Sequence, residues 1–169
     1  ANGLPVDTIQ SISQDREVKM WFGTYGGGVV MLKTEMFEHF TPDTGLPESL
    51  VYAIAEDGQG GFFFGTGGGG VGHLEGGLVT TLDSTDGLAG DTVYSICRDK
   101  GGSMWFASYG QGVSYRLGDV FINLSSIDGL ASDKVFYVYR DLRDTLWFAT
   151  QGGAEGVGIS TTKAVVVSS

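Results

Sequence analysis

The sequence predicts an all-β protein, a β-propeller built from four 42-residue blades of four strands each. Two observations lead to this prediction. Short motifs recur along the chain at a constant step of 42 residues, and each unit divides into four short segments separated by turn residues, with no sustained helical period. Four-stranded units of about 40–45 residues are typical of propeller blades.

The repeat is visible in four independent sets of residues. A Gly-Leu pair opens each unit, at Gly3, Gly45, Gly87 and Gly129. The same step relates an aspartate (Asp15, Asp57, Asp99, Asp141), an aromatic residue (Trp21, Phe63, Trp105, Trp147) and a hydroxyl residue (Thr24, Thr66, Ser108, Thr150). We therefore expect one propeller unit over residues 1–169, with blades at 3–44, 45–86, 87–128 and 129–169. The fourth unit alone carries two extra residues, near Ala154 and Glu155.

The second unit shows how a blade divides into strands. Its segments "LVYAIAED", "GFFFGT", "VGHLEG" and "LVTTLD" are expected to form the first to fourth strands, with Gly or Asp at the turns. The glycine tract "GTGGGG" at 65–70 falls between the second and third strands. A phosphate-binding loop would need a following Lys-Ser/Thr and a helix N-terminus, which this tract lacks. We interpret it as a turn.

The first strand of each unit is expected to line the central channel. One of its faces carries bulky residues, and the other carries mostly small ones: Ser11, Ala53, Ser95, Ser13, Ala55 and Cys97. Small residues suit positions where neighbouring sheets crowd near the axis. Tyr137 and Tyr139 depart from this pattern in the fourth unit. We expect them to fill space beside the insertion, with a stacking surface at the channel as the alternative.

Two of the repeated sets have expected structural roles. Trp21, Phe63, Trp105 and Trp147 should pack between blades, because large aromatic side chains dominate such interfaces. The four aspartates should accept hydrogen bonds from backbone N–H groups of the turn into the second strand. Successive blades would hold them too far apart to share a calcium ion, and no metal ligand set or cofactor is expected.

The composition limits the partners. Twenty acidic residues against ten basic ones give a formal charge of −10, which weighs against nucleic acids and anionic membranes. The single cysteine, Cys97, excludes an internal disulfide. No run of 18 apolar residues is present, so no membrane insertion is expected.

The repeated motifs resemble the two-component regulator propeller repeat. Units two and three carry the pattern well, as "GLPESLVYAIAEDGQGGFFFGTGGGGV" and "GLAGDTVYSICRDKGGSMWFASYGQGV", and unit one carries it as "GLPVDTIQSISQDREVKMWFGTYGGGV". The resemblance runs from about Gly3 to Val157. It implies an extracytoplasmic sensor domain, periplasmic or extracellular, of the kind that binds glycan-derived or other small ligands in bacterial signalling proteins. Family members usually have many more repeats.

The number of blades in the closed ring follows from packing. Four blades would diverge by about 90° and eight by about 45°, and wide wedges need bulky residues to fill them. The small residues Gly23, Gly65, Ala107 and Ala149 after the aromatic set favour narrow wedges. We therefore expect half of an eight-bladed ring, completed by a second copy in a homodimer or by blades of a longer parent chain.

A ligand is expected on the face that carries the turns after the second strands. There the repeats diverge at two positions, and divergent turns on a rigid scaffold are where binding specificity resides. The candidate ligand-binding residues are Tyr25, Tyr109, Gln151, Asp7, Asp91 and Asp133. Unconstrained surface residues are the alternative explanation of this divergence.

Catalysis is not expected. The two histidines, His39 and His73, fall in different registers, and no nucleophile or zinc motif is present. The leading hypothesis is a non-catalytic ligand- or protein-binding module of sensor type that self-associates through open blade faces. The alternatives are a metal-dependent lyase or hydrolase, for which His73 with Glu75 would be the starting point, and a purely structural, engineered half-propeller without a ligand.

Overall fold

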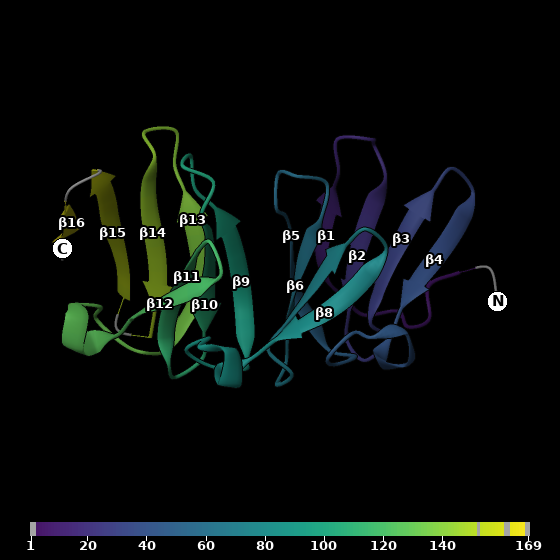
Figure 1. Ribbon diagram of the computed structural model, residues 1–169, viewed down its shortest axis with the longest axis horizontal. Coiled ribbons are helices and arrows are strands. Elements are labelled where there is room, and N and C mark those ends of the chain that lie inside the picture. Colours follow the sequence, from purple (N-terminus) through teal and green to yellow (C-terminus); the bar gives the residue numbers. More distant parts are fainter. Residues whose placement is uncertain (1–2, 152, 161–162, 168–169) are drawn as a thin grey trace.

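The computed structural model describes residues 3–151, 153–160 and 163–167 of the 169-residue chain. It consists of four antiparallel four-stranded sheets with three short 3-10 helices between them (Figure 1). Within each sheet the strands are ordered as they occur in the chain. The all-β fold and its four four-stranded blades are thus confirmed. Positions 152, 161–162 and 168–169 of the predicted fourth blade, 129–169, lie outside the described residues.

The first sheet contains β1 (Ile9–Gln14), β2 (Met20–Thr24), β3 (Val29–Lys33) and β4 (Met36–Phe40). The second contains β5 (Val51–Glu56), β6 (Phe62–Thr66), β7 (Val71–Glu75) and β8 (Leu78–Leu82). The third contains β9 (Val93–Arg98), β10 (Met104–Ser108), β11 (Gly112–Leu117) and β12 (Val120–Leu124). The fourth contains β13 (Val135–Arg140), β14 (Thr145–Thr150), β15 (Gly153–Ser160) and β16 (Lys163–Val167).

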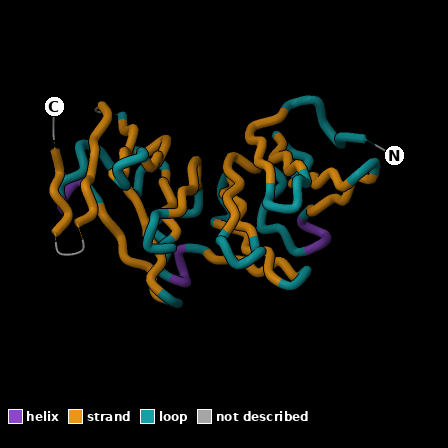
Figure 2. Tube along the Cα trace, turned by 90° about the horizontal axis from the view of Figure 1, so that it is seen from above, coloured by secondary structure: helices purple, strands orange, loops and turns teal. Residues whose placement is uncertain are grey.

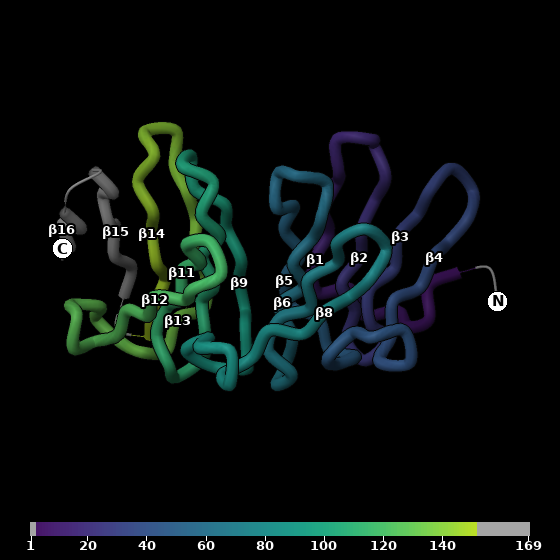
Figure 3. The backbone as a smooth tube through the Cα atoms, viewed as in Figure 1, coloured from purple at the N-terminus to yellow at the C-terminus, as the bar shows by residue number. Residues whose placement is uncertain are grey.

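The four blades stand side by side in chain order. Their first strands are neighbours, β1 with β5, β5 with β9 and β9 with β13, so these strands form the inner edge of the array. The sheets of the first and last blades lie at opposite ends of the molecule, as the ribbon and the chain trace show (Figures 1 and 3). Seen from above, the array is an open row of blades (Figure 2).

Each junction between successive blades has its own hydrophobic core. Trp21 of blade one packs against Phe62 and Phe64 of blade two, with ring centroids 4.2 and 6.0 Å away. The same arrangement joins Phe63 to Phe106, and Trp105 to Phe148. Because apolar burial occurs between sheets, each blade depends on its neighbours for stability.

The Gly-Leu pair connects one blade to the next. Short 3-10 helices, η1 (Pro42–Thr44), η2 (Ser84–Asp86) and η3 (Ser126–Asp128), end at Gly45, Gly87 and Gly129, whose φ angles are 100°, 103° and 112°. Glycine adopts this left-handed conformation without the steric cost of a side chain. The following leucines, Leu46, Leu88 and Leu130, then enter the inter-blade cores.

In blades one to three the glycine tract is a turn that also joins two blades. In blade one the Oγ1 of Thr24 donates to the carbonyl of Gly28 at 2.8 Å, and the N–H of Gly28 donates to Ser49 of the next blade at 2.8 Å. The same inter-blade bond recurs from Gly70 to Asp91 and from Gly112 to Asp133, each at 2.8 Å. The interpretation of "GTGGGG" as a turn is confirmed.

The two end faces expose residues that the interior junctions bury. Leu4 is 41% exposed, whereas Leu46, Leu88 and Leu130 are 2%, 2% and 5% exposed. Trp147 is 44% exposed, whereas Trp21, Phe63 and Trp105 are 3%, 2% and 4% exposed. The sequence motif is the same in each set, so the difference arises because no neighbouring blade among the described residues covers these two positions.

Candidate functional site

The repeated aspartates organise the turns between the first two strands of each blade. Asp15 accepts hydrogen bonds from the N–H groups of Glu17 and Lys19, both at 2.9 Å, and from the indole N–H of Trp21 at 2.9 Å. Although burial favours the neutral form, these hydrogen bonds lower the pKa of Asp15 below its ordinary value. The aspartate is therefore an ionised acceptor that fixes both the turn and the inter-blade tryptophan.

Blades three and four contain the same aspartate–indole bond. Trp105 donates to Asp99 at 2.9 Å and Trp147 donates to Asp141 at 3.0 Å. The bond to the turn was expected from the sequence, but the bond to the indole was not. The signal was available, because a fixed separation of six residues links the aspartate to the tryptophan in the three units that have one.

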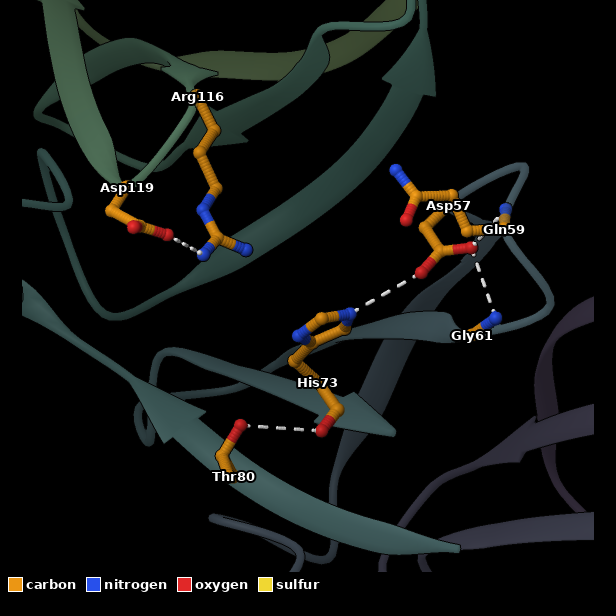
Figure 4. A network of polar contacts seen from close by, with 7 residues as sticks. All are labelled: Asp57, Gln59, Gly61, His73, Thr80, Arg116 and Asp119. Carbon is orange, nitrogen blue, oxygen red and sulfur yellow. Dashed lines mark hydrogen bonds and ion pairs between the residues drawn. The ribbon is translucent and has the colours of Figure 1, made fainter. Parts of the chain in front are cut away.

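Blade two replaces the tryptophan by two residues. Phe63 has no N–H to donate, and His73 on the neighbouring strand stacks on its ring at 4.1 Å, with 8° between the planes. The Nε2 of His73 lies 3.4 Å from a carboxylate oxygen of Asp57 (Figure 4). The remaining bonds to Asp57 come from the N–H groups of Gln59, at 2.6 Å, and Gly61, at 2.9 Å. Phe63 and His73 together occupy the role that one indole has elsewhere.

This arrangement accounts for a histidine that the sequence placed near a hypothetical lyase centre. His73 contacts Asp57 and Phe63, and among the described residues no group of three or more His, Cys, Asp or Glu side chains is arranged to hold a metal ion. Burial raises the pKa of the Cys97 thiol, which reduces its reactivity at neutral pH. His73 is therefore held by the turn and the aromatic ring of blade two, and Cys97 is a partly buried thiol.

A β-bulge recurs in the first strand of every blade. Pairing with the second strand skips one residue each time, namely Gln10, Tyr52, Tyr94 and Phe136. A bulge turns a side chain out of the regular alternation of the sheet. Because the first strands form the inner edge, the bulged residues of successive blades come together there: Tyr52 and Tyr94 are 4.6 Å apart, and Tyr94 and Phe136 are 5.9 Å apart, between ring centroids.

Tyr109 and Tyr25 extend this group, which we call the aromatic row (Tyr25, Tyr52, Tyr94, Tyr109 and Phe136). The ring of Tyr109 lies 5.7 Å from that of Tyr94 and 5.8 Å from that of Phe136. Lys134 places its Nζ 5.5 Å from the Tyr109 ring, within the range of a cation–π contact. Burial raises the pKa of Tyr52, and Tyr94 and Tyr25 add to that effect.

The structure thus divides the six candidate ligand-binding residues into three pairs. Tyr25 and Tyr109 are exposed members of the aromatic row. Asp91 and Asp133 instead bind the starts of the 3-10 helices, accepting from the N–H and hydroxyl of Ser84 and of Ser126. The remaining two are exposed residues outside the aromatic row: Asp7 and Gln151.

Two clefts open on the opposite face, beside the aspartate turns. The cleft between blades one and two, which we call cleft 1, has a volume of about 540 Å³. The equivalent cleft between blades two and three, cleft 2, has a volume of about 350 Å³ and is lined by Asp57, His73, Arg116 and Asp119 among others (Figure 4). Sequence reasoning predicted neither cleft, because each is formed by turns of two different blades.

The fold and the repeated junctions define a β-propeller array. Two segments, residues 45–68 and 87–110, match the sequence model of the two-component regulator propeller. The resemblance recognised in these repeats is therefore confirmed. No curated protein sequence matches the chain.

The fold is similar to those of extracellular domains of two-component systems. One is described as the extracellular domain of a hybrid two-component system from B. thetaiotaomicron, with a TM-score of 0.83 and 23% identity over 98% of this chain. A second extracellular domain from the same organism has a TM-score of 0.78 and 20% identity over 95% of this chain. The chain spans about a quarter of the length of these two domains, 23% and 24%.

Virginiamycin B lyase from Staphylococcus aureus is also similar in fold. Its TM-score is 0.72, with 14% identity over 98% of this chain and 57% of the lyase. At these identities the likeness concerns the fold alone. The described part of the chain contains no helix long and apolar enough to cross a membrane.

Proposed function

We propose that the chain is a non-catalytic propeller module of sensor type that binds a ligand across the aromatic row. The observation that carries this proposal is the repeated bulge, which brings aromatic side chains of blades two, three and four to one accessible inner edge. Flat aromatic surfaces beside a cation, here Lys134, suit ligands with apolar faces and polar edges. Glycan-derived ligands, implied by the family resemblance, have this chemistry.

The location proposed for the module is the periplasm or the extracellular space. The match to sensor-type repeats and the similarity to extracellular domains support it. A binding role is favoured over a lyase role because His73 lies beside Asp57 and serves the turn of blade two through it.

A glycan array followed by thermal-shift measurements tests the ligand proposal. A ligand that binds the folded state raises the melting temperature, by mass action. The double variant Tyr25→Ala/Tyr109→Ala should abolish the shift while the free protein keeps its fold, with a lower melting temperature because Tyr109 loses its ring contacts. The matched control is Tyr139→Ala, which removes an exposed tyrosine away from the row. An unchanged shift in the double variant would refute the proposed site.

The second part of the proposal is that the end faces associate, so that a second copy supplies the missing neighbouring blades. Support comes from the comparison of equivalent positions. Leu4 and Trp147 are exposed, whereas the equivalent residues of the interior junctions are covered by a neighbouring blade. Ile12 on the face of blade one is also exposed, whereas its equivalent Val138 is buried. Apolar sheet faces of this kind favour association.

The new junction would differ from the interior ones. In the interior, the Oγ of Ser95 approaches the backbone N–H and carbonyl of Val138 at 3.2 and 3.4 Å, so adjacent first strands are close. The fourth blade has Tyr137 at the position of Ser95, and Tyr137 and Tyr139 are both more than half exposed. They do not fill interior space, contrary to the expectation from the sequence. A neighbour there would have to stand further away, at a wider wedge.

Substitution of the end faces tests this association. Trp147→Glu should prevent it by placing a charge in an apolar interface, while the monomer keeps its fold because Trp147 is already 44% exposed. Leu142→Glu is the control, because Leu142 is a fully exposed residue in the turn before β14. Equal self-association of the two variants and the unmodified protein in sedimentation would refute an interface at this face.

A further inference from the structure

We propose that cleft 1 is a binding site for an organic cation, an ammonium or guanidinium group on an apolar body. The cleft lies at the aspartate-turn ends of blades one and two, whereas the aromatic row lies at the opposite ends of the first strands. It is therefore a second site, and it does not depend on the ligand proposed for the aromatic row.

The floor of cleft 1 is apolar. It is formed by nearly buried side chains of both blades: Trp21, Met31, Phe40, Phe62 and Leu74. Trp21 and Phe62 are stacked with centroids 4.2 Å apart, and the indole is held by Asp15, so this part of the floor is rigid. The volume of about 540 Å³ lies within the range of small-molecule sites, about 300–1,000 Å³.

The rim of cleft 1 is acidic. Four carboxylates, Asp15, Glu17, Glu38 and Glu56, line it, against two cations, Arg16 and Lys19, a difference of two negative charges. Lys19 pairs with Glu17 at 2.5 Å, and Arg16 pairs with Glu56 of the other blade at 3.4 Å. The arginine is mostly exposed, with 69% of its side chain accessible, so this ion pair is weak and replaceable.

An entering cation would therefore meet two carboxylates. It could take the place of Arg16 beside Glu56, and Glu38 on β4 offers a second negative charge. The turn residues at the rim include Gly60, Gly76 and Gly77, whose lack of side chains leaves the entrance open. Hydrophobic contact with the floor and charge at the rim together select an amphipathic cation over a neutral or anionic molecule.

Cleft 2 shows that this lining is particular to the first junction. The position of Leu74 in cleft 1 corresponds to Arg116 in cleft 2, one repeat later. The same wedge of the same fold therefore accepts arginine at this position. Leu74→Arg thus adds a positive charge to cleft 1 without introducing a residue foreign to the repeat.

The test uses the full chain and three six-carbon probes: hexylammonium, hexanol and hexanoate. Binding is followed in a ¹⁵N–¹H spectrum by the three indole N–H signals, assigned by Trp→Phe substitution. Trp21 lines cleft 1, whereas Trp105 and Trp147 lie in other blades and serve as internal references. We expect saturable shifts of the Trp21 signal with hexylammonium, at least about tenfold weaker binding of hexanol, and no binding of hexanoate.

Three variants test whether the charge of cleft 1 determines binding. Glu38→Gln should weaken hexylammonium binding about fivefold, and Leu74→Arg should weaken it at least about tenfold, whereas Glu35→Gln, with the same charge change outside the cleft, should leave it unchanged. Hexanol binding as tightly as hexylammonium would overturn the proposal. So would equal shifts of all three indole signals, or unchanged binding by Leu74→Arg.

Discussion

The interior and terminal tryptophans provide the most informative perturbation of the blade junctions. Trp105 is 4% exposed, lies 4.5 Å from the Tyr115 ring and 5.8 Å from Phe148 of the next blade, and donates to Asp99. Trp147 occupies the same position in the last blade and makes the same bond, to Asp141, but is 44% exposed. Replacing each by alanine compares one motif with and without a covering blade.

The expected magnitudes follow from burial. Removing a buried tryptophan costs about 3–5 kcal/mol of unfolding free energy. Hydrophobic stabilisation scales with the area removed from water, so the half-exposed Trp147 should contribute roughly 2 kcal/mol. In a protein of this size each kcal/mol corresponds to about 2–4 °C in melting temperature. Trp105→Ala should therefore lower the melting temperature by about 6–20 °C and Trp147→Ala by about 4–8 °C.

Circular dichroism during thermal and urea unfolding measures both losses, at a protein concentration low enough to keep the chain monomeric. Association would add burial to Trp147 only, so its loss should grow with protein concentration while that of Trp105 stays constant. Equal losses for the two variants in the monomer would refute the reasoning, because the exposure of Trp147 would then have no energetic consequence.

Three further predictions concern single blades. The double variant Phe63→Trp/His73→Met should restore the indole bond to Asp57 and keep or raise the unfolding free energy, whereas His73→Met alone should lower it by about 1 kcal/mol. Urea unfolding measures both values. An equal loss in the single and the double variant would show that Phe63 and His73 are not equivalent to an indole. Despite burial, hydrogen bonds from turn N–H groups and from His73 lower the pKa of Asp57 below 3.8. The contribution of Asp57 to the unfolding free energy is therefore present above that pH and is lost as pH falls through the lower pKa of the folded state. Asp57→Asn should flatten the curve of unfolding free energy against pH in this acid range, and an unchanged curve would contradict the assignment. Gly112→Ala should destabilise the fold by several kcal/mol, because its Cβ would collide with the carbonyl of Leu124. Gly118→Ala should cost about 1 kcal/mol, because Gly118 also has a positive φ but lies in open space. Similar melting temperatures for the two variants would argue against the close approach of Gly112 to Leu124.

The repeat made the blades predictable from sequence. A step of 42 residues fixes which residues are equivalent, and strand alternation then assigns their faces, so the turns, strands and aspartate acceptors could be placed. Contacts that substitute for one another were harder to foresee. His73 replaces part of an indole only because it pairs with Phe63 across two strands, and sequence spacing does not show that stacking.

The candidate sites depended on details that a regular strand pattern does not contain. The aromatic row exists because a bulge removes one residue per blade from the ladder, and Tyr52 and Tyr94 would otherwise lie in ordinary alternation. Asp91 and Asp133 were grouped with Tyr109 on the basis of a shared face, but their carboxylates are engaged by Ser84 and Ser126. Clefts between blades arise from the relative placement of sheets, which local patterns do not specify.

Sedimentation velocity over a wide range of protein concentrations tests the central claim, that the end faces are blade junctions without their partner. The chain has a mass of 17.9 kDa, so two copies give 2 × 17.9 = 35.8 kDa. We predict a closed dimer of that mass that is favoured by salt, because screening reduces repulsion between two chains of charge −10. A species of 17.9 kDa that persists at all concentrations and salt levels would contradict the account.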